Sequence, residues 1–264
     1  MAPASVALEG IRPASPPRHP ALVAASDPAL AASLVRPAAR ALSEPRTPTG
    51  LAPLDALLEG GFPRGQLAEL IGPRTSGRTR VLLGTLAGAT ARGGWAALVD
   101  GADGLDPVSA ETLGVSLDRL LWIRCGGRLA DAWRATDALV HGGGFELVAV
   151  DLGDLPPWAL ARTPPAVFVR LQRAVERRPT GLLVAGPRRV AGSLAAVAVA
   201  LAPRAVRWAA GGPGLLAGLE TEARLVRSRT RAPGASVRFV WTALDSARAA
   251  PPARPHVAAR DARG

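Results

Sequence analysis

The chain has 264 residues, 48% of them hydrophobic, and a formal net charge of +11, which suits one sizeable folded domain with flanking tails. A single cysteine, Cys125, excludes a disulfide framework and a cysteine-bound metal. No apolar run approaches the ~18 residues of a membrane span, and the first residues lack the hydrophobic region of a signal peptide, so we expect a cytoplasmic protein without a membrane partner.

The two ends of the chain differ in composition from its middle. Residues 1–48 contain nine prolines and little periodicity, which predicts a mostly disordered arm with one short helix between Ala29 and Leu42. Residues 246–264 predict a second disordered tail, rich in arginine and proline. The folded core is therefore expected at residues 49–245.

Apolar runs alternate with helical patterns along this core, which predicts an α/β fold with a mostly parallel sheet flanked by helices. Five core strands are expected at Leu67–Ile71, Ala96–Asp100, Leu120–Ile123, Leu147–Asp151 and Gly181–Ala185. Helices are expected around Arg78–Ala91, Leu129–Val140 and Val167–Val175, and again after Ser193. Three more strands are expected after Pro203, at Ala205–Trp208, Ala223–Arg229 and Val237–Trp241.

A phosphate-binding loop is predicted between the first core strand and the helix after it. Residues 72–79 read GPRTSGRT and fit the pattern GxxxxGK[ST] except that Arg78 replaces the lysine. In such a loop backbone N–H groups and a helix N-terminus surround the phosphates. The expected nucleotide-binding residues are Gly72, Pro73, Arg74, Thr75, Ser76, Gly77, Arg78, Thr79 and Arg80. The alternative is a glycine-rich turn without a ligand.

Arg78 bears on catalysis. Arginine keeps the positive charge, but its planar fork is wider than an ammonium group. Every basic residue of the chain is arginine, and tyrosine and asparagine are also missing, so GC-rich coding alone could have replaced a lysine. A lysine needed for fast phosphoryl transfer should have resisted that drift. The substitution therefore predicts a poor or absent ATPase.

Asp151 is the candidate metal ligand. It ends the apolar strand Leu147–Asp151, and an acid at such a position commonly holds Mg²⁺ together with the hydroxyl of the phosphate loop, here Thr79. Taken alone, an aspartate that caps the next turn is the commoner interpretation. Together with the loop, Thr79 and Asp151 predict a site for Mg²⁺ bound to ATP.

Residues 49–73, 98–107 and 113–115 resemble the core of the bacterial RecA recombinases, and the similarity resumes more loosely at 181–190 and 224–233. The resemblance implies a RecA-like phosphate-loop core that binds ATP and Mg²⁺. It also implies that Asp106 contacts adenine. Arg227 and Arg229 correspond to basic residues that reach the nucleotide of a neighbouring subunit, so a homo-oligomer is among the expected partners.

Departures from the family pattern fall on the catalytic positions. The glutamate that activates water corresponds to Ala102, and the neighbouring Asp103 is a shorter acid with a different direction. The adenine-stacking tyrosine corresponds to Ser109, and the glutamine that senses the terminal phosphate corresponds to Pro187. Because coding bias explains only the loss of lysine, the combined changes predict an inactive or slow ATPase.

The DNA-binding loops of the family are shortened in this chain. Only Val-Ala-Gly-Ser separates Arg188-Arg189 from the expected helix, and a short proline-rich link that contains Trp158 replaces the first loop. Arg188, Arg189 and Trp158 are the DNA-binding candidates. The other tryptophans, Trp95, Trp122, Trp133, Trp208 and Trp241, are expected in the core.

A truncated core of this kind resembles the ImuA-type proteins, accessories of translesion synthesis in the SOS damage response. That resemblance implies an adaptor whose partners are single-stranded DNA, a RecA filament or a lesion-bypass polymerase. Residues 186–231 hold eight arginines and two glutamates, which favours an anionic partner, although a solvated basic surface explains the same count. The alternatives are an active DNA-dependent ATPase of the RecA class, with Arg78 and Asp103 in the catalytic roles, and a small-molecule kinase.

Overall fold

The computed structural model describes residues 45–153, 155–208 and 216–242. The helix expected within residues 29–42 and the expected tail at 246–264 lie outside these residues. Arg46–Thr47 (β1) pairs with Phe62–Pro63 (β2), so regular structure begins a few residues before Thr49.

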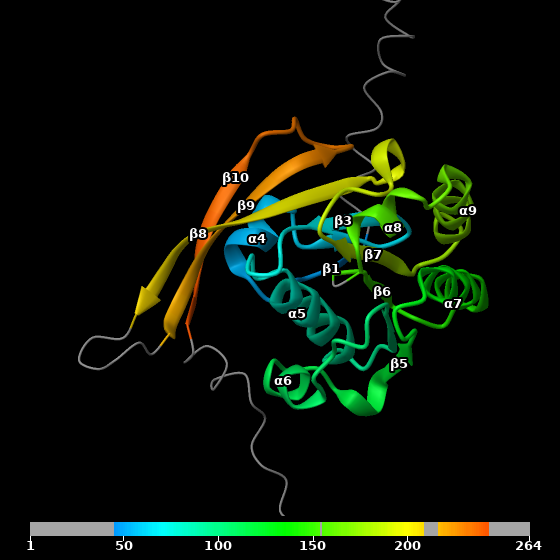
Figure 1. Cartoon of the computed structure of the whole chain (residues 1–264), viewed down its shortest axis with the longest axis horizontal. Helices are drawn as coiled ribbons and strands as arrows, with labels where there is room; N and C mark the ends of the chain where they lie inside the picture. Colours follow the sequence, from blue (N-terminus) through cyan, green and yellow to red (C-terminus); the bar gives the residue numbers. More distant parts are fainter. Residues whose placement is uncertain (1–44, 154, 209–215, 243–264) are drawn as a thin grey trace, which may run out of the picture. The chain divides into compact units, whose positions relative to one another are not determined.

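An eight-stranded sheet forms the centre of the described chain, with the order β10-β9-β8-β3-β7-β6-β4-β5 (Figure 1). From β8 to β5 all neighbouring strands are parallel, and β9 and β10 add on antiparallel. The strands are β3 (Leu67–Ile71), β4 (Ala96–Asp100), β5 (Leu120–Arg124), β6 (Leu147–Asp151), β7 (Gly181–Gly186), β8 (Val197–Trp208), β9 (Leu216–Ser228) and β10 (Ser236–Thr242).

Helices cover both faces of the parallel part, which explains why β4 and β7 are buried along their whole length. One core cluster packs α4 (Ala52–Leu57), α5 (Arg78–Thr90) and α6 (Pro107–Thr112) against the sheet, and the other packs α7 (Leu129–Gly142), α8 (Pro157–Ala161) and α9 (Pro165–Val175). Two short 3₁₀ turns occupy Leu117–Arg119 and Gly192–Leu194. Among the described residues, no helix is long and apolar enough to cross a membrane.

The fold class predicted from the sequence is confirmed, and the five expected core strands match to within a residue at their ends. The helix expected after Ser193 is wrong. That segment forms a 3₁₀ turn and then β8, whose Val197 and Ala200 pair with Ala68 and Ile71 of β3. Alanine favours a helix locally, but the alternation of Val197 to Leu201 fits a buried strand between β3 and β9, and tertiary pairing overrides propensity.

Two of the tryptophan predictions are also wrong. Trp133 and Trp241 are buried and Trp122 packs against the core, as expected. Trp95 is 49% exposed and Trp208 is 62% exposed. Trp95 precedes the first residue of β4, and Trp208 ends β8 well beyond the part that pairs with β3, so neither side chain has a layer of helices above it.

Candidate functional site

The predicted loop lies between the end of β3 and the start of α5. Its turn is closed by Ser76, which is fully buried and whose backbone N–H and hydroxyl both donate to the carbonyl of Pro73, at 3.1 and 2.7 Å. Gly77 precedes α5 with φ +81°, a left-handed conformation that favours glycine. A Cβ atom at Gly77 would also lie 2.6 Å from Nε1 of Trp241. The loop therefore has the curled backbone that a phosphate cradle requires.

The antiparallel strands hold this loop from the side. Thr221 of β9, fully buried, donates its hydroxyl to the carbonyl of Ser76 at 3.2 Å and accepts from Nε1 of Trp241 at 3.0 Å. The Arg80 guanidinium lies 5.1 Å from the centre of the Trp241 ring. Sequence reasoning missed Thr221, because a contact across 145 residues leaves no local pattern.

The side chain of Arg78 is buried inside the site, with 3% of the residue exposed. One guanidinium nitrogen, Nη1, donates to the carbonyl of Gly72. Its other nitrogen, Nη2, lies so close to Gly153 that a Cβ atom there would overlap it. The Asp151 carboxylate lies near the guanidinium, but Nε is still a buried N–H group without a hydrogen-bond partner among the described residues. Such a group is costly, so this site is suited to an anionic ligand.

Asp151 ends β6 on the far side of Arg78. Its Oδ1 accepts a hydrogen bond from the N–H of Gly153 at 2.8 Å. A Cβ atom built onto Gly153 would lie 2.9 Å from the same oxygen, so Asp151 packs tightly against this glycine. Thr79 is exposed at the first turn of α5. The structure thus brings Arg78 and Asp151 to the carboxyl ends of β3, β7 and β6, the edge of a parallel sheet where ligands bind.

The fit of these residues to Mg²⁺ is poor. A protein site for Mg²⁺ normally supplies one or two carboxylates in a near-octahedral set of oxygens. Asp100 pairs in register with Asp151, but its two oxygens accept from the N–H groups of Gly104 and Leu105 and from Nε1 of Trp122. The Asp151 carboxylate lies beside the positively charged guanidinium of Arg78, which repels a metal ion.

The positions that the family resemblance assigns to water activation lie elsewhere. Ala102 packs against the cluster under α7. The Asp103 carboxylate accepts from the N–H of Gly126 at 3.1 Å and pairs with Arg124 at 3.2 Å. Arg124 is the last residue of the edge strand β5 and Gly126 follows it, and β4 is three strand spacings, roughly 14 Å, from β3. Asp103 is therefore engaged at the edge of the sheet.

Asp106 starts α6 and accepts hydrogen bonds from the hydroxyl and the N–H of Ser109. The Ser109 hydroxyl, followed by the Ser109 N–H, holds the pKa of Asp106 below its usual value. The expected contact of this carboxylate with adenine stays a prediction.

The three DNA-binding candidates lie at the surface. Trp158 is 64% exposed on α8, with the Arg162 guanidinium 5.5 Å from its ring, and Arg188 is exposed. Arg189 donates to the carbonyl of Gly192 at 2.6 Å. Arg188 and Trp158 are free to contact a ligand, whereas Arg189 helps to shape the turn after β7.

A buried acid that sequence reasoning missed fixes the same turn. Glu69 of β3, 1% exposed, accepts from the N–H groups of Val190 and Ala191 at 2.6 and 2.8 Å. Its second oxygen lies 3.5 Å from Nε of Arg189. An acid inside the apolar run Leu67–Ile71 was the available signal, since a buried carboxylate needs partners.

Arg227 and Arg229 lie beside the start of β8. Nε of Arg227 donates to the carbonyl of Ala195 at 2.5 Å, and Arg229 lies 3.8 Å from Glu176. Their predicted contact with the nucleotide of a neighbouring subunit stays a prediction.

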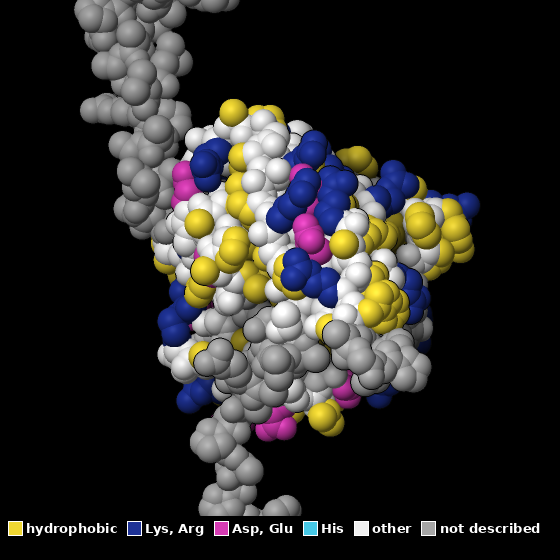
Figure 2. Space-filling view, turned by 90° about the vertical axis from the view of Figure 1, so that its left-hand side faces the viewer, with side chains coloured by type: hydrophobic (Ala, Val, Ile, Leu, Met, Phe, Trp, Pro, Cys, Tyr) yellow, Lys and Arg dark blue, Asp and Glu magenta, His cyan; other side chains and the backbone are white. Residues whose placement is uncertain are grey.

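A cluster of arginines lies on one face of β8, β9 and β10, where Figure 2 shows basic side chains gathered around acidic ones. Glu222, with 6% of its side chain exposed, pairs with Arg204, Arg224 and Arg238. The Arg204 hydrogen bonds are the main reason that the pKa of Glu222 lies below its usual value. We call Arg204, Arg224 and Arg238 with Glu222 the arginine face.

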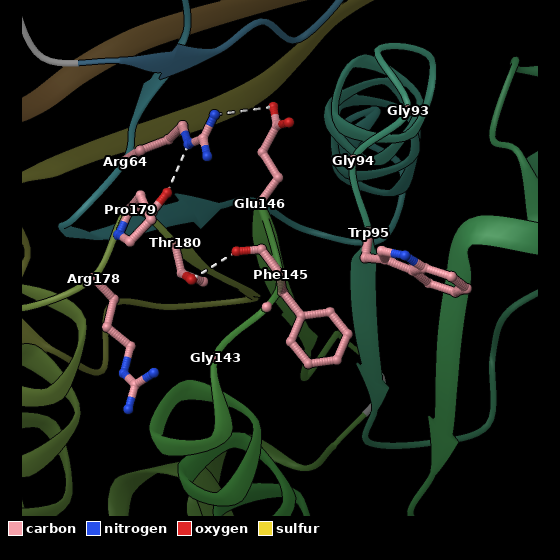
Figure 3. Close-up of a pocket in the computed structure, with 11 residues that line it drawn as sticks. Arg64, Gly93, Gly94, Trp95, Gly143, Phe145, Glu146, Arg178, Pro179 and Thr180 are labelled. Atoms are coloured by element: carbon pink, nitrogen blue, oxygen red, sulfur yellow. Dashed lines mark hydrogen bonds and ion pairs between the residues drawn. The ribbon is translucent and has the colours of Figure 1, made fainter.

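Two cavities lie outside the loop. One, of about 340 Å³, opens at the amino ends of β4, β6 and β7 (Figure 3), where Arg64 donates to the carbonyl of Pro179 at 2.7 Å and lies 3.6 Å from Glu146. The other, of about 730 Å³, runs along α5 and is lined by Trp241, Arg80 and the backbone before α4. Neither is lined by residues 72–79.

The sheet, its covering helices and the curled loop at its carboxyl edge define an α/β protein of the phosphate-loop class. Residues 39–158 match the family model of the RecA N-terminal domain. The crystal structure of the RadB recombinase has a similar fold, with a TM-score of 0.56 and 20% identity, over 73% of this chain and 94% of that chain. A comparison with curated proteins gives no match. The chain therefore has a RecA-like fold, and its residues 39–158 are similar to the RecA N-terminal domain, as the sequence resemblance predicted.

Proposed function

We propose that this protein is a RecA-family adaptor of bacterial DNA repair that binds ATP in its phosphate loop and hydrolyses it slowly or not at all. The observation that carries the proposal is Arg78, a buried guanidinium in the loop whose Nε has no hydrogen-bond partner among the described residues. A phosphate group supplies a negative charge and accepts two parallel hydrogen bonds from a guanidinium.

Slow hydrolysis follows from the surroundings of the loop. The position of the water-activating glutamate holds Ala102, and Asp103 is paired with Arg124 and with the N–H of Gly126. General-base catalysis contributes typically 10²–10⁴-fold to a rate, and the base has to reach the attacking water. Ala102 has no group that accepts a proton, and the Asp103 carboxylate is held by Arg124 and Gly126, so neither residue meets that requirement.

The arginine face and the exposed Trp158 support an anionic macromolecular partner. Arginines bind phosphates without regard to sequence, and exposed aromatic rings stack on bases. We therefore propose single-stranded DNA as a partner, together with a RecA filament or a lesion-bypass polymerase, as in ImuA-type accessories of the SOS response. The arms at 1–48 and 246–264 are proposed as tethers to these proteins.

An active DNA-dependent ATPase of the RecA class is the second candidate. One observation favours it: Asp151 lies at the carboxyl end of β6, where enzymes of the phosphate-loop class carry the acid that holds Mg²⁺.

Purified full-length protein separates the two candidates. ATP binding and phosphate release are measured with and without single-stranded DNA, for the natural chain, for Arg78→Ala and for the surface control Arg170→Ala. We expect ATP binding without DNA-stimulated release, and binding weakened at least about tenfold by Arg78→Ala alone, because charged hydrogen bonds contribute ~1.5–3 kcal/mol each. DNA-stimulated phosphate release that Arg78→Ala abolishes would establish the ATPase instead.

A further inference from the structure

The Arg78 guanidinium spans the carboxyl edge of the sheet from β3 to β6, the edge at which phosphate-loop proteins bind the terminal phosphates of a nucleotide and their metal. It reaches from the carbonyl of Gly72, at the end of β3, to the backbone of Gly153, after the end of β6. Strand β7 lies between these two strands in the sheet. A lysine side chain is shorter and ends in a single nitrogen, so it would not make both contacts.

Gly153 is matched to this arginine. Its φ lies outside the left-handed region, so its backbone does not demand glycine. The surrounding atoms do require glycine, because a Cβ atom would overlap Nη2 of Arg78 and would lie 2.9 Å from Oδ1 of Asp151. The turn after β6 therefore has room for the Arg78 guanidinium because residue 153 lacks a Cβ atom.

The guanidinium also retains donors for a ligand. Of its five N–H groups, the one with an identified partner points at Gly72, and Nε has none among the described residues. Asp151, which would coordinate a metal, lies beside this positive charge and accepts from the N–H of Gly153. A divalent cation entering here would meet a like charge and, among the described residues, the carboxylate of Asp151, whereas phosphate oxygens would meet an opposite charge and guanidinium N–H groups.

We propose that Arg78 takes the place of the metal ion, so that the loop binds the phosphates of ATP or ADP without Mg²⁺. Gly153 is a positioning residue that leaves room for the guanidinium. This inference rests on the proposed function, because it assigns the binding mode of the same loop.

The test is isothermal calorimetry of ATP with the full chain, once in EDTA and once in excess Mg²⁺. We expect dissociation constants within about threefold of each other. Binding that requires Mg²⁺ would overturn the metal-free mode and leave the proposed nucleotide-binding function intact. An absence of binding in both buffers would overturn both.

Variants at the two positions sharpen the test. Arg78→Lys should restore metal dependence, with binding at least tenfold tighter in Mg²⁺ than in EDTA. Gly153→Ala should weaken binding in EDTA at least tenfold, whereas Gly142→Ala, at a glycine with open space around it, should change nothing. Thermal unfolding of each variant checks that it folds.

The double variant Arg78→Lys/Gly153→Ala provides a second test if Gly153→Ala alone is unstable. In the Arg78→Lys background the alanine has no guanidinium to displace, so Gly153→Ala should change the dissociation constant for ATP by less than twofold. An equal effect of Gly153→Ala in both backgrounds would overturn the proposed match between the two residues, because their effects would then be independent.

Discussion

Thr221→Val tests how the antiparallel strands hold the phosphate loop. Valine has nearly the shape of threonine, so the substitution removes the hydroxyl and little volume. Two hydrogen bonds are lost: the one donated to the carbonyl of Ser76 and the one accepted from Nε1 of Trp241. Trp241 is 7% exposed, so its N–H would be left in the interior without that partner.

The expected loss follows from these contacts. A buried donor without a partner costs about 1–3 kcal/mol, and a hydrogen bond contributes about 1 kcal/mol. Thr221→Val should therefore lower the free energy of unfolding by about 2–4 kcal/mol, a large share of the 5–15 kcal/mol typical of a domain. At a denaturant slope of roughly 3 kcal/mol/M, the midpoint in urea should fall by about 1 M.

Urea unfolding followed by tryptophan fluorescence measures this change, and Thr136→Val is the matched control. Thr136 is equally buried, but its hydroxyl donates to the carbonyl of Ala132 within α7 and accepts from no buried indole. The control should lose about 1 kcal/mol. Equal losses of unfolding free energy in both variants would contradict this expectation. They would show that the Thr221 hydroxyl, which links β9 to the loop, stabilises the protein no more than the Thr136 hydroxyl does within its own helix.

Three further predictions concern other parts of the molecule. Glu69→Leu should lower the free energy of unfolding by about 3 kcal/mol, because two backbone N–H groups, including that of Val190, lose their buried acceptor; a change below 1 kcal/mol in urea unfolding would contradict this role. The folded-state pKa of Glu222 is lowered, so the ionised carboxylate stabilises the fold above the unfolded pKa of about 4.3, and this stabilisation is lost as pH falls through the folded pKa. The melting temperature of Glu222→Gln should therefore fall less between pH 7 and pH 3 than that of the natural chain. Parallel plots of melting temperature against pH would count against this role. Arg204→Ala and Arg224→Ala should each reduce, by ~0.7, the slope of the logarithm of the single-stranded DNA binding constant against the logarithm of salt concentration, measured by fluorescence anisotropy. Unchanged slopes would show that DNA binds to another surface.

The sequence predicted the parallel core well because its signals are local. Strands such as Leu147–Asp151 are continuous apolar runs that end in a polar residue, and the glycine pattern of residues 72–79 lies directly between a strand and a helix. Both features depend on neighbours in the chain, so periodicity and spacing were sufficient to find them.

Contacts between distant segments were beyond that reasoning. The alanine-rich run after Ser193 has a helical composition, and only its pairing with β3 and β9 makes it a strand. Thr221 supports the loop across 145 residues, and Gly153 leaves space for a side chain on another element. The burial of Arg78 likewise depends on how far β3 lies from β6, which no pattern in the sequence records.

A phosphate loop that holds ATP without cleaving it should keep the bound nucleotide unchanged, so the decisive experiment follows the fate of bound ATP. Full-length protein is incubated with a substoichiometric amount of γ-labelled ATP and with single-stranded DNA, and the bound nucleotide is recovered by filtration. We expect the recovered nucleotide to remain ATP after many minutes, and we expect Arg78→Ala to retain far less of it. Recovery of ADP with released phosphate, at a rate raised by DNA, would show that the loop cleaves ATP.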